Sequence, residues 1–174
     1  NYIGGKYKLL PQLIEFFPDK INTFVDLFSG GFNVGINVDC NKVVCNDMNT
    51  FIIDLYKELY SKPIDETLNK ITGRINEYGL SKENEEAFKK FRNYYNKTKE
   101  PIDLYTLSCY SFNYQFRFNN NKEYNNPFGR NRSQFSDNMK SNLILFTEKL
   151  KSMNVEFLSE PFDKVDLSKL NSED

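Results

Sequence analysis

The chain has 174 residues, of which 39% are hydrophobic, including 16 Phe and 11 Tyr. This is enough apolar material for a real core, so we expect one domain, or one domain with a small insertion. The net charge of −1 excludes a general attraction of the whole molecule to nucleic acid, so any such site has to be a local patch. The sequence has no histidine, which removes the commonest general base and most zinc sites.

The three cysteines, Cys40, Cys45 and Cys109, have neither metal-ligand spacing nor the even count of a disulfide scaffold. We therefore expect no metal and reduced thiols in the cytoplasm. The sequence shows no signal peptide and no apolar run long enough to span a membrane, so no membrane partner is expected. It starts at Asn1 and stops in a polar run, which predicts a piece of a longer polypeptide.

The first residues place two glycines, Gly4 and Gly5, before an expected helix over residues 6–16. Gly-Gly-Lys before a helix offers backbone donors and the Lys6 cation, which suits a carboxylate or a phosphate. The alternative is a flexible terminus with a solvated lysine. The side chains expected to point inward from this helix are Leu9, Leu10, Leu13 and Phe17.

The next segment has the pattern of strand, glycine turn and helix. Thr23–Leu27 is a β-branched and apolar run, Ser29, Gly30 and Gly31 form a tight turn, and a helix can begin at Phe32. This pattern opens a nucleotide-binding α/β unit, because glycines let the backbone approach a ligand and helix-start N–H groups can bond it. The alternative is a glycine turn that serves only packing.

The glycine spacing differs from the dinucleotide fingerprint. Gly30 and Gly35 match its first and third glycines, but Phe32 stands where the middle glycine is required. An adenosyl ligand without a pyrophosphate therefore fits this turn better than NAD.

A second strand is expected at Lys42–Asn46, with Asp47 at its carboxyl end. Ligands of such sheets bind at the carboxyl ends of strands, where an acid commonly takes the ribose hydroxyls. Asp47 follows Asp26 by 21 residues, close to the separation of about 20 in nucleotide-binding units. The alternative role for Asp47 is to cap the next helix, although Asn49 could supply that cap.

The middle of the chain is expected to be helical. A helix over residues 49–60 is followed by two amphipathic helices between residues 63 and 96, the second capped by Ser81, and Pro101 begins a further helix. This block interrupts the alternation of strands and helices, so we interpret it as an inserted subdomain. The apolar face of the first helix comprises Ile52, Ile53, Leu55, Tyr56 and Leu59.

An aromatic segment at residues 109–118 leads into a region with five cations and two acids between Ser111 and Lys140. Aromatics interleaved with Arg and Asn can stack on bases and hold phosphates. A turn near Glu123 predicts a hairpin ending at residues 127–130; alternatively, the segment is an aromatic edge packed on the core. The chain continues with a helix capped by Asp137 whose core residues are Met139, Leu143, Phe146, Leu150 and Met153, a strand at residues 155–158 and a turn at residues 166–170.

Four stretches resemble, in order, the DNA adenine-N6 methyltransferases of the D12 class, which include the GATC-modifying adenine methylase. Residues 2–6 (Tyr-Ile-Gly-Gly-Lys) are similar to that family's N-terminal cofactor motif, and residues 24–31 (Phe-Val-Asp-Leu-Phe-Ser-Gly-Gly) to its main S-adenosylmethionine loop. Residues 46–49 (Asn-Asp-Met-Asn) resemble the segment of the ribose-binding acid, and residues 117–130 resemble the hairpin of the target-recognition region.

The resemblance implies a Rossmann-like α/β methyltransferase sheet with an inserted, mainly helical target-recognition subdomain that carries a β-hairpin. The implied divisions are 1–60 and 141–174 for the cofactor-binding domain and 61–140 for the insertion. S-adenosylmethionine would contact Tyr2, Gly4, Gly5, Lys6, Asp26, Phe28, Ser29, Gly30, Gly31 and Asp47. Double-stranded DNA would contact Phe112, Asn113, Arg117, Asn126, Pro127, Arg130 and Arg132, with Phe112 and Asn113 near an extruded adenine.

One departure is serious, because the family's catalytic Asp-Pro-Pro-Tyr motif is missing from these 174 residues. Residues 125–128 (Asn-Asn-Pro-Phe) lack the second-position proline and lie inside the hairpin match, so we assign no catalytic residue. The resemblance implies that the motif would follow Asp174. The expected function is therefore adenine methylation by the family, with this chain alone inactive and a restriction endonuclease as a possible cognate partner. The open alternatives are a non-catalytic cofactor- or DNA-binding fragment completed by a second polypeptide, and a methyltransferase acting on another substrate.

Overall fold

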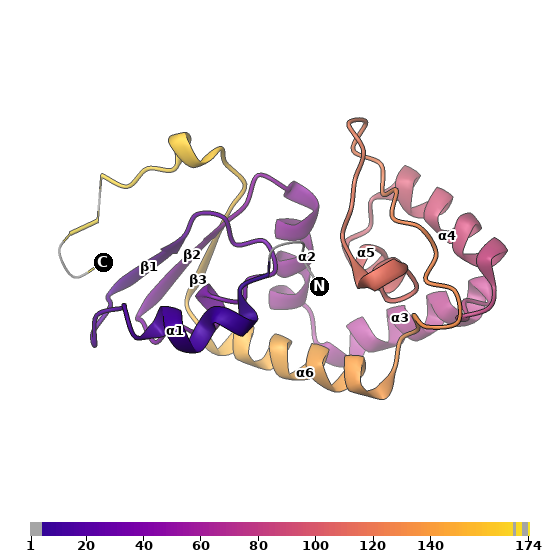
Figure 1. Cartoon of the computed structure of the whole chain (residues 1–174), viewed down its shortest axis with the longest axis horizontal. Coiled ribbons are helices and arrows are strands. Elements are labelled where there is room, and N and C mark those ends of the chain that lie inside the picture. The colour runs from indigo at the N-terminus through magenta and orange to yellow at the C-terminus, as the bar shows by residue number, and fades with distance from the viewer. Residues whose placement is uncertain (1–4, 169, 172–173) are drawn as a thin grey trace.

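The computed structural model describes residues 5–168, 170–171 and 174. Three parallel strands form one sheet in the order β1 (Thr23–Asp26), β2 (Lys42–Asn46) and β3 (Val155–Leu158). Figure 1 shows this sheet at one end of the molecule and a block of helices at the other, with one helix between them and another running beneath both. The architecture is mixed α/β, in agreement with the methyltransferase class predicted from sequence.

All three strands lie where the sequence pattern predicts them. The register pairs Asp26 with Cys45 and Asn46 with Leu158, so the carboxyl ends of the strands meet at one edge of the sheet. The middle strand is the most buried, with Val43 and Cys45 at 1% and 0% exposure, as expected for a run flanked on both sides by hydrogen-bonded strands. Burial raises the pKa of the Cys45 thiol to about 12.

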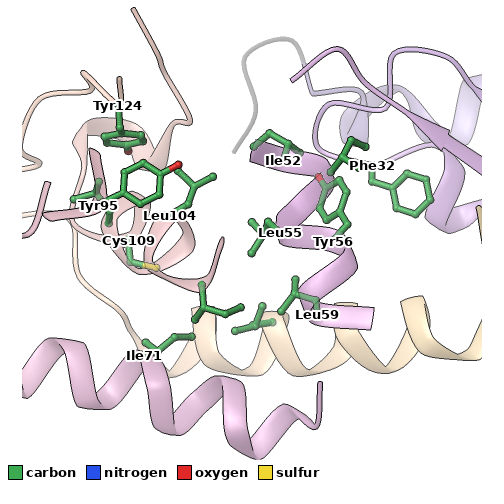
Figure 2. Packing of buried hydrophobic residues seen from close by; sticks show 14 of the residues in the cluster. Phe32, Ile52, Leu55, Tyr56, Leu59, Ile71, Tyr95, Leu104, Cys109 and Tyr124 are labelled. Carbon is green, nitrogen blue, oxygen red and sulfur yellow. The ribbon is translucent and has the colours of Figure 1, made fainter. Parts of the chain in front are cut away.

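The helix α2 (Thr50–Ser61) lies between the sheet and the helical block. All five residues of its predicted apolar face are buried, and Figure 2 shows Tyr56 beside Phe32 of the sheet end while Leu55 points toward the helices. Buried side chains from both ends of the molecule form one continuous cluster through this helix. The division of the chain into residues 1–60, 61–140 and 141–174 stays a prediction.

The helical block consists of α3 (Ile64–Tyr78), α4 (Glu85–Thr98) and α5 (Pro101–Cys109). Its helices are found where predicted, but the predicted cap of α4 is wrong. Asn84, and not Ser81, caps that helix, because the Asn84 side chain accepts from the Ala87 amide at 3.1 Å. The Ser81 hydroxyl oxygen instead accepts a hydrogen bond from the Glu83 amide at 3.3 Å. This bond lies one turn before the helix begins.

A buried acid joins two helices of this block. Asp103 of α5 is fully buried, and its Oδ1 accepts from Arg74 Nε of α3 at 3.0 Å. Arg74 also donates to Tyr94 Oη of α4 at 2.8 Å. Burial raises the pKa of Asp103, and the Arg74 guanidinium opposes that rise. This ion pair therefore joins α3 to α5 inside the helical block.

The last helix, α6 (Asp137–Ser152), runs beneath the sheet and the block (Figure 1). Its cap is Ser136, whose hydroxyl accepts from the Met139 amide at 3.3 Å, so the prediction of Asp137 as the cap is wrong by one residue. The predicted inward stripe of α6 is found in the core: Leu143 and Leu150 are buried, and Met139, Phe146 and Met153 pack against the cluster.

The N-terminal helix is shorter than predicted. Residues 6–16 form a 3-10 turn, η1 (Tyr7–Leu9), followed by the five-residue α1 (Leu10–Ile14). Leu10 is buried as expected, but Leu9 is 46% exposed and does not point inward. Pro11 stands at the start of α1, where its missing N–H costs nothing, and this separates the two pieces.

The segment after α5 has little regular structure. It contains a 3-10 turn, η3 (Phe112–Tyr114), and turns back through two isolated antiparallel bridges, Ser111 to Phe128 and Phe118 to Tyr124. The chain then continues through α6 and β3 to a last 3-10 turn, η4 (Phe162–Lys164). Among the residues described, no helix combines the length and the apolar character needed to cross a membrane.

Candidate functional site

Asp47 stands at the carboxyl end of β2 and joins two neighbouring segments. Its Oδ2 accepts from the Gly30 amide at 2.8 Å, and its Oδ1 accepts from the Asn49 amide at 2.8 Å. The carboxylate therefore links the glycine turn after β1 to the start of α2. Asn49 occupies the cap position of α2, but its side chain makes no capping bond. The capping role weighed from sequence thus falls partly to Asp47, and its cofactor role stays a prediction.

The glycine turn is held from several sides. The Tyr56 hydroxyl of α2 donates to the Gly30 carbonyl at 2.6 Å, and the Ser29 amide donates to the Asn46 carbonyl at 2.9 Å. Gly30 has φ +47°, the left-handed region that favours glycine. A rigid turn of this kind at a strand end brings the main chain of Gly31 close to whatever binds there.

The predicted helix from Phe32 is wrong. Phe32 has φ +54°, which ends any right-handed helix at that residue, and only a 3-10 turn, η2 (Gly35–Asn37), follows. Its ring is completely buried and packs on Tyr56 with 5.8 Å between ring centroids. Phe32 therefore forms the floor of the glycine turn, in the place where a dinucleotide-binding turn has a glycine.

Asp26 lies under the same turn, where its Oδ2 accepts from the Gly35 amide at 3.1 Å. Burial raises the pKa of Asp26, the Gly35 amide opposes that rise, and the charge of Asp47 adds to it. A Cβ atom on Gly35 would stand 2.3 Å from Cε2 of Phe32, so only glycine fits there. Asp26 thus positions the chain behind the turn, and its cofactor role stays a prediction.

Sequence reasoning missed Asn46, which joins the loops after all three strands. Its Nδ2 donates to the Leu27 and Glu160 carbonyls, both at 3.0 Å, and its Oδ1 accepts from the Glu160 amide at 3.0 Å. The side chain is 1% exposed, so these bonds are protected from water. The available signal was an amide residue at the end of a strand, directly after the apolar residues Val43, Val44 and Cys45.

A pair of exposed aromatic rings stands beyond the strand ends. Phe28, from the loop after β1, and Phe162, from η4, are 72% and 57% exposed. Their ring centroids are 5.6 Å apart with an interplanar angle of 44°. Phe162 was missed from sequence because 134 residues separate the two partners. Two exposed rings beyond the strand ends offer a purine an apolar surface.

The N-terminal cofactor motif falls partly outside the described residues. Tyr2 and Gly4 lie there, whereas Gly5 and Lys6 are described and exposed. Gly5 lines a cavity of about 530 Å³ together with Gly31 of the glycine turn. The other residues around this cavity come from the N-terminal segment, the turn, helices α2, α5 and α6 and the segment after η3: Tyr7, Lys8, Asn33, Leu55, Tyr56, Leu59, Tyr105, Phe116, Asn142, Leu143 and Phe146.

The residues assigned to DNA gather around a second hollow. Phe112, Asn113, Arg130 and Arg132 line a cavity of about 430 Å³ in the segment between α5 and α6. Phe112 is 48% exposed. The Arg130 guanidinium forms an ion pair with Glu85 of α4, which holds it at the rim and lowers the pKa of the Glu85 carboxyl. The structure thus brings together four of the seven predicted residues.

The other three predicted residues are placed differently. Arg117 and Pro127 are exposed, but they do not line the cavity. Asn126 is 1% exposed, and its side chain points into the loop, where it donates to the Phe112 carbonyl at 2.9 Å. Its side chain is therefore turned away from the surface at which DNA could bind. In the described part of the chain, no cluster of Cys, Asp and Glu side chains could hold a metal ion.

Comparison with known proteins shows the family of this chain. Residues 2–174 match the D12 class N6 adenine-specific DNA methyltransferases, and the chain belongs to this family. It is 60% identical over 174 residues to the type II methyltransferase M.FokI of Planomicrobium okeanokoites and 53% identical over 174 residues to the modification methylase StsI of Streptococcus sanguinis. Both alignments cover all of this chain but only 27% of the relative, so the chain spans about a quarter of their length. The DNA adenine methylase of Escherichia coli K12 is 29% identical over 168 residues, which are 93% of this chain and 56% of that protein.

Proposed function

We propose that this chain is part of a site-specific DNA adenine-N6 methyltransferase, with S-adenosylmethionine at the carboxyl ends of β1 and β2 and duplex DNA at residues 111–133. The observation that carries the cofactor half is the Asp47 carboxylate bonded to the glycine turn, with the rings of Phe28 and Phe162 exposed at the same edge. Membership of the D12 class supports the choice of substrate and of methyl donor.

The chemistry of the donor set fits this cofactor. An ionised carboxylate has about four acceptor positions, and Asp47 uses two of them for the Gly30 and Asn49 amides. The remaining positions suit the two hydroxyls of a ribose. The rings of Phe28 and Phe162 offer the adenine base a stacking surface, and S-adenosylmethionine, when bound, supplies an activated methyl group.

Phe162→Ala is expected to weaken S-adenosylmethionine binding, because one of the two exposed rings would be lost. Stacking of a base on an aromatic ring contributes roughly 1–3 kcal/mol, so we expect a loss of about fivefold to a hundredfold in affinity. Titration calorimetry measures this directly. Leu167→Ala is the control, because Leu167 is also exposed, at 42%, in the same C-terminal segment. Equal affinities of the Phe162 variant and the unmodified chain would contradict the stacking role.

The DNA half rests on Phe112, Asn113, Arg130 and Arg132 around one hollow. Methylation at N6 requires the adenine to leave the helix, because the base stack blocks in-line approach to the methyl group. An exposed aromatic such as Phe112 can occupy or stack on the disturbed base step, while the arginines hold phosphates or base edges. Since the sequence contains no Asp-Pro-Pro-Tyr motif, these residues provide no group to hold the N6 amino group. We therefore propose that this chain by itself transfers no methyl.

Arg117→Ala is expected to weaken duplex binding. If this exposed cation contacts a phosphate, its loss lowers the salt dependence of binding by about one unit of slope; if it contacts a base, it costs roughly 1–3 kcal/mol at one base pair. Fluorescence anisotropy with a labelled duplex at several salt concentrations measures both, and Lys149→Ala on α6 is the charge-matched control. If the chain binds single-stranded RNA as tightly as duplex DNA, the result would favour another substrate. Incorporation of labelled methyl into DNA by the 174-residue chain would contradict the proposal that the chain is inactive.

The names of two relatives, a type II methyltransferase and a modification methylase, also suggest the biological setting. Type II modification enzymes act beside a restriction endonuclease that cuts the same unmethylated sequence. We therefore propose a cognate restriction endonuclease as a functional partner of the protein to which this chain belongs.

A further inference from the structure

The loop that carries Phe112 contains two adjacent residues in the left-handed region of the backbone. Asn113 has φ +53° and Tyr114 has φ +56°. Asparagine adopts this conformation with moderate ease, but a bulky aromatic residue rarely does, so the pair is strained. The strain gives the chain a sharp reversal, which leaves Phe112 and Asn113 exposed at the rim of the 430 Å³ cavity.

A buried polar side chain spans this strained pair. The Asn126 Nδ2 donates to the Phe112 carbonyl at 2.9 Å and to the Gln115 carbonyl at 3.2 Å. These two carbonyls belong to the residues immediately before and after Asn113 and Tyr114. One amide group thus joins both ends of the reversal, and it is 1% exposed, so water does not compete for its bonds.

A second buried group supports the same carbonyl. The Tyr124 hydroxyl donates to the Gln115 carbonyl at 2.8 Å and also pairs with the Ser111 hydroxyl, which donates to the Leu107 carbonyl of α5 at 2.8 Å. Ser111 and Tyr124 are 0% and 1% exposed. The strained loop is therefore anchored through Tyr124 and Ser111 to the last turn of a buried helix.

We propose that Asn126 is a positioning residue that holds Phe112 and Asn113 in the conformation in which they meet DNA. This inference rests on the proposed function of the loop, and it replaces the direct DNA contact expected for Asn126 from sequence. A loop that is already strained into its binding conformation loses less conformational entropy when it binds, so its affinity is higher than that of a mobile loop. Asn126 acts on DNA only through the backbone of residues 112–115.

The test is a double-mutant cycle on duplex DNA binding by the 174-residue chain. Asn126→Leu removes both donors at similar volume and is expected to weaken binding tenfold or more, with S-adenosylmethionine affinity unchanged. In a chain that already carries Phe112→Ala, Asn126→Leu is expected to cost clearly less affinity, because one of the two groups that it positions is gone. If Asn126 contacted DNA directly, Asn126→Leu would weaken duplex binding by the same factor with and without Phe112→Ala. Asn120→Leu, an exposed position in the same segment, controls for the change of polarity.

Loop order is measured separately from DNA binding. The chain has no tryptophan, so Phe112→Trp introduces a single reporter whose anisotropy decay records motion of the loop. Asn126→Leu should add a fast, large-amplitude component to that decay. Tyr124→Phe, which keeps the ring and loses only the hydroxyl, should produce a smaller change in the same direction, and it tests the inference if Asn126→Leu fails to fold.

The outcomes separate the two proposals. If the unmodified chain binds no duplex, the proposed DNA-binding function falls and this inference falls with it. If the unmodified chain binds and Asn126→Leu binds equally well, or loses the same affinity with and without Phe112, only the positioning role is overturned. An unchanged anisotropy decay in both loop variants also overturns it.

Discussion

Asp47→Ala is expected to reduce S-adenosylmethionine affinity by more than any other single substitution at the strand ends. The substitution removes the acceptor proposed for the ribose hydroxyls, and hydrogen bonds to a charged group contribute about 1.5–3 kcal/mol each. It also releases the Gly30 and Asn49 amides, both 2.8 Å from the carboxylate, so the glycine turn loses its link to the start of α2. We expect a loss of about a hundredfold or more, which corresponds to at least 2.7 kcal/mol.

Titration calorimetry of S-adenosylmethionine into the two chains measures this loss, and the sequence offers a matched control. Asp39 is an exposed acid just before β2, whereas Asp47 follows the same strand at its other end. Asp39→Ala makes the same change of charge and should bind as tightly as the unmodified chain. Circular dichroism of Asp47→Ala must show a folded protein for the comparison to count. Saturable binding of equal strength in the Asp47 and Asp39 variants would rule out the ribose role.

The contrast between what sequence predicted and what it missed has a physical basis. The three strands and the buried face of α2 follow from periodic apolar residues, and such a pattern is local to each element. Asp47 was proposed as a site residue because its position after a strand is itself a local signal. Phe162 was missed because the order of the strands in the sheet brings its ring to Phe28, and sequence patterns do not specify that order.

Errors at element ends have a similar cause. Ser81 and Asn84 are both good capping residues three positions apart, and the side-chain bond to Ala87 decides between them. For Asn126, the resemblance placed an amide among the expected DNA contacts, but it could not tell an outward side chain from one that is 1% exposed. The inward direction of Asn126 is set by its hydrogen bonds to the Phe112 and Gln115 carbonyls, which no local sequence pattern predicts.

Phe32 is the residue whose loss should most destabilise the glycine turn. Its ring is fully buried against Tyr56, and truncation of a buried Phe to Ala costs about 3–5 kcal/mol in unfolding free energy. Phe32→Ala keeps the unfavourable φ of +54° while it removes the packing that offsets this strain. Urea unfolding followed by circular dichroism should show the unfolding free energy falling by that amount, with S-adenosylmethionine binding weakened because the turn loses its floor.

A glycine at the same position separates the two contributions. Phe32→Gly creates the same cavity but relieves the left-handed backbone, a gain of about 1–2 kcal/mol, against about 0.4–1 kcal/mol for the more flexible unfolded chain. The glycine variant should therefore be at least as stable as the alanine variant, the reverse of the order within a helix. Phe16→Ala is the control, because that ring is 84% exposed and its loss should change stability by no more than about 0.5 kcal/mol. A glycine variant clearly less stable than the alanine variant would show that Phe32 is not strained, and that packing alone decides the conformation of this turn.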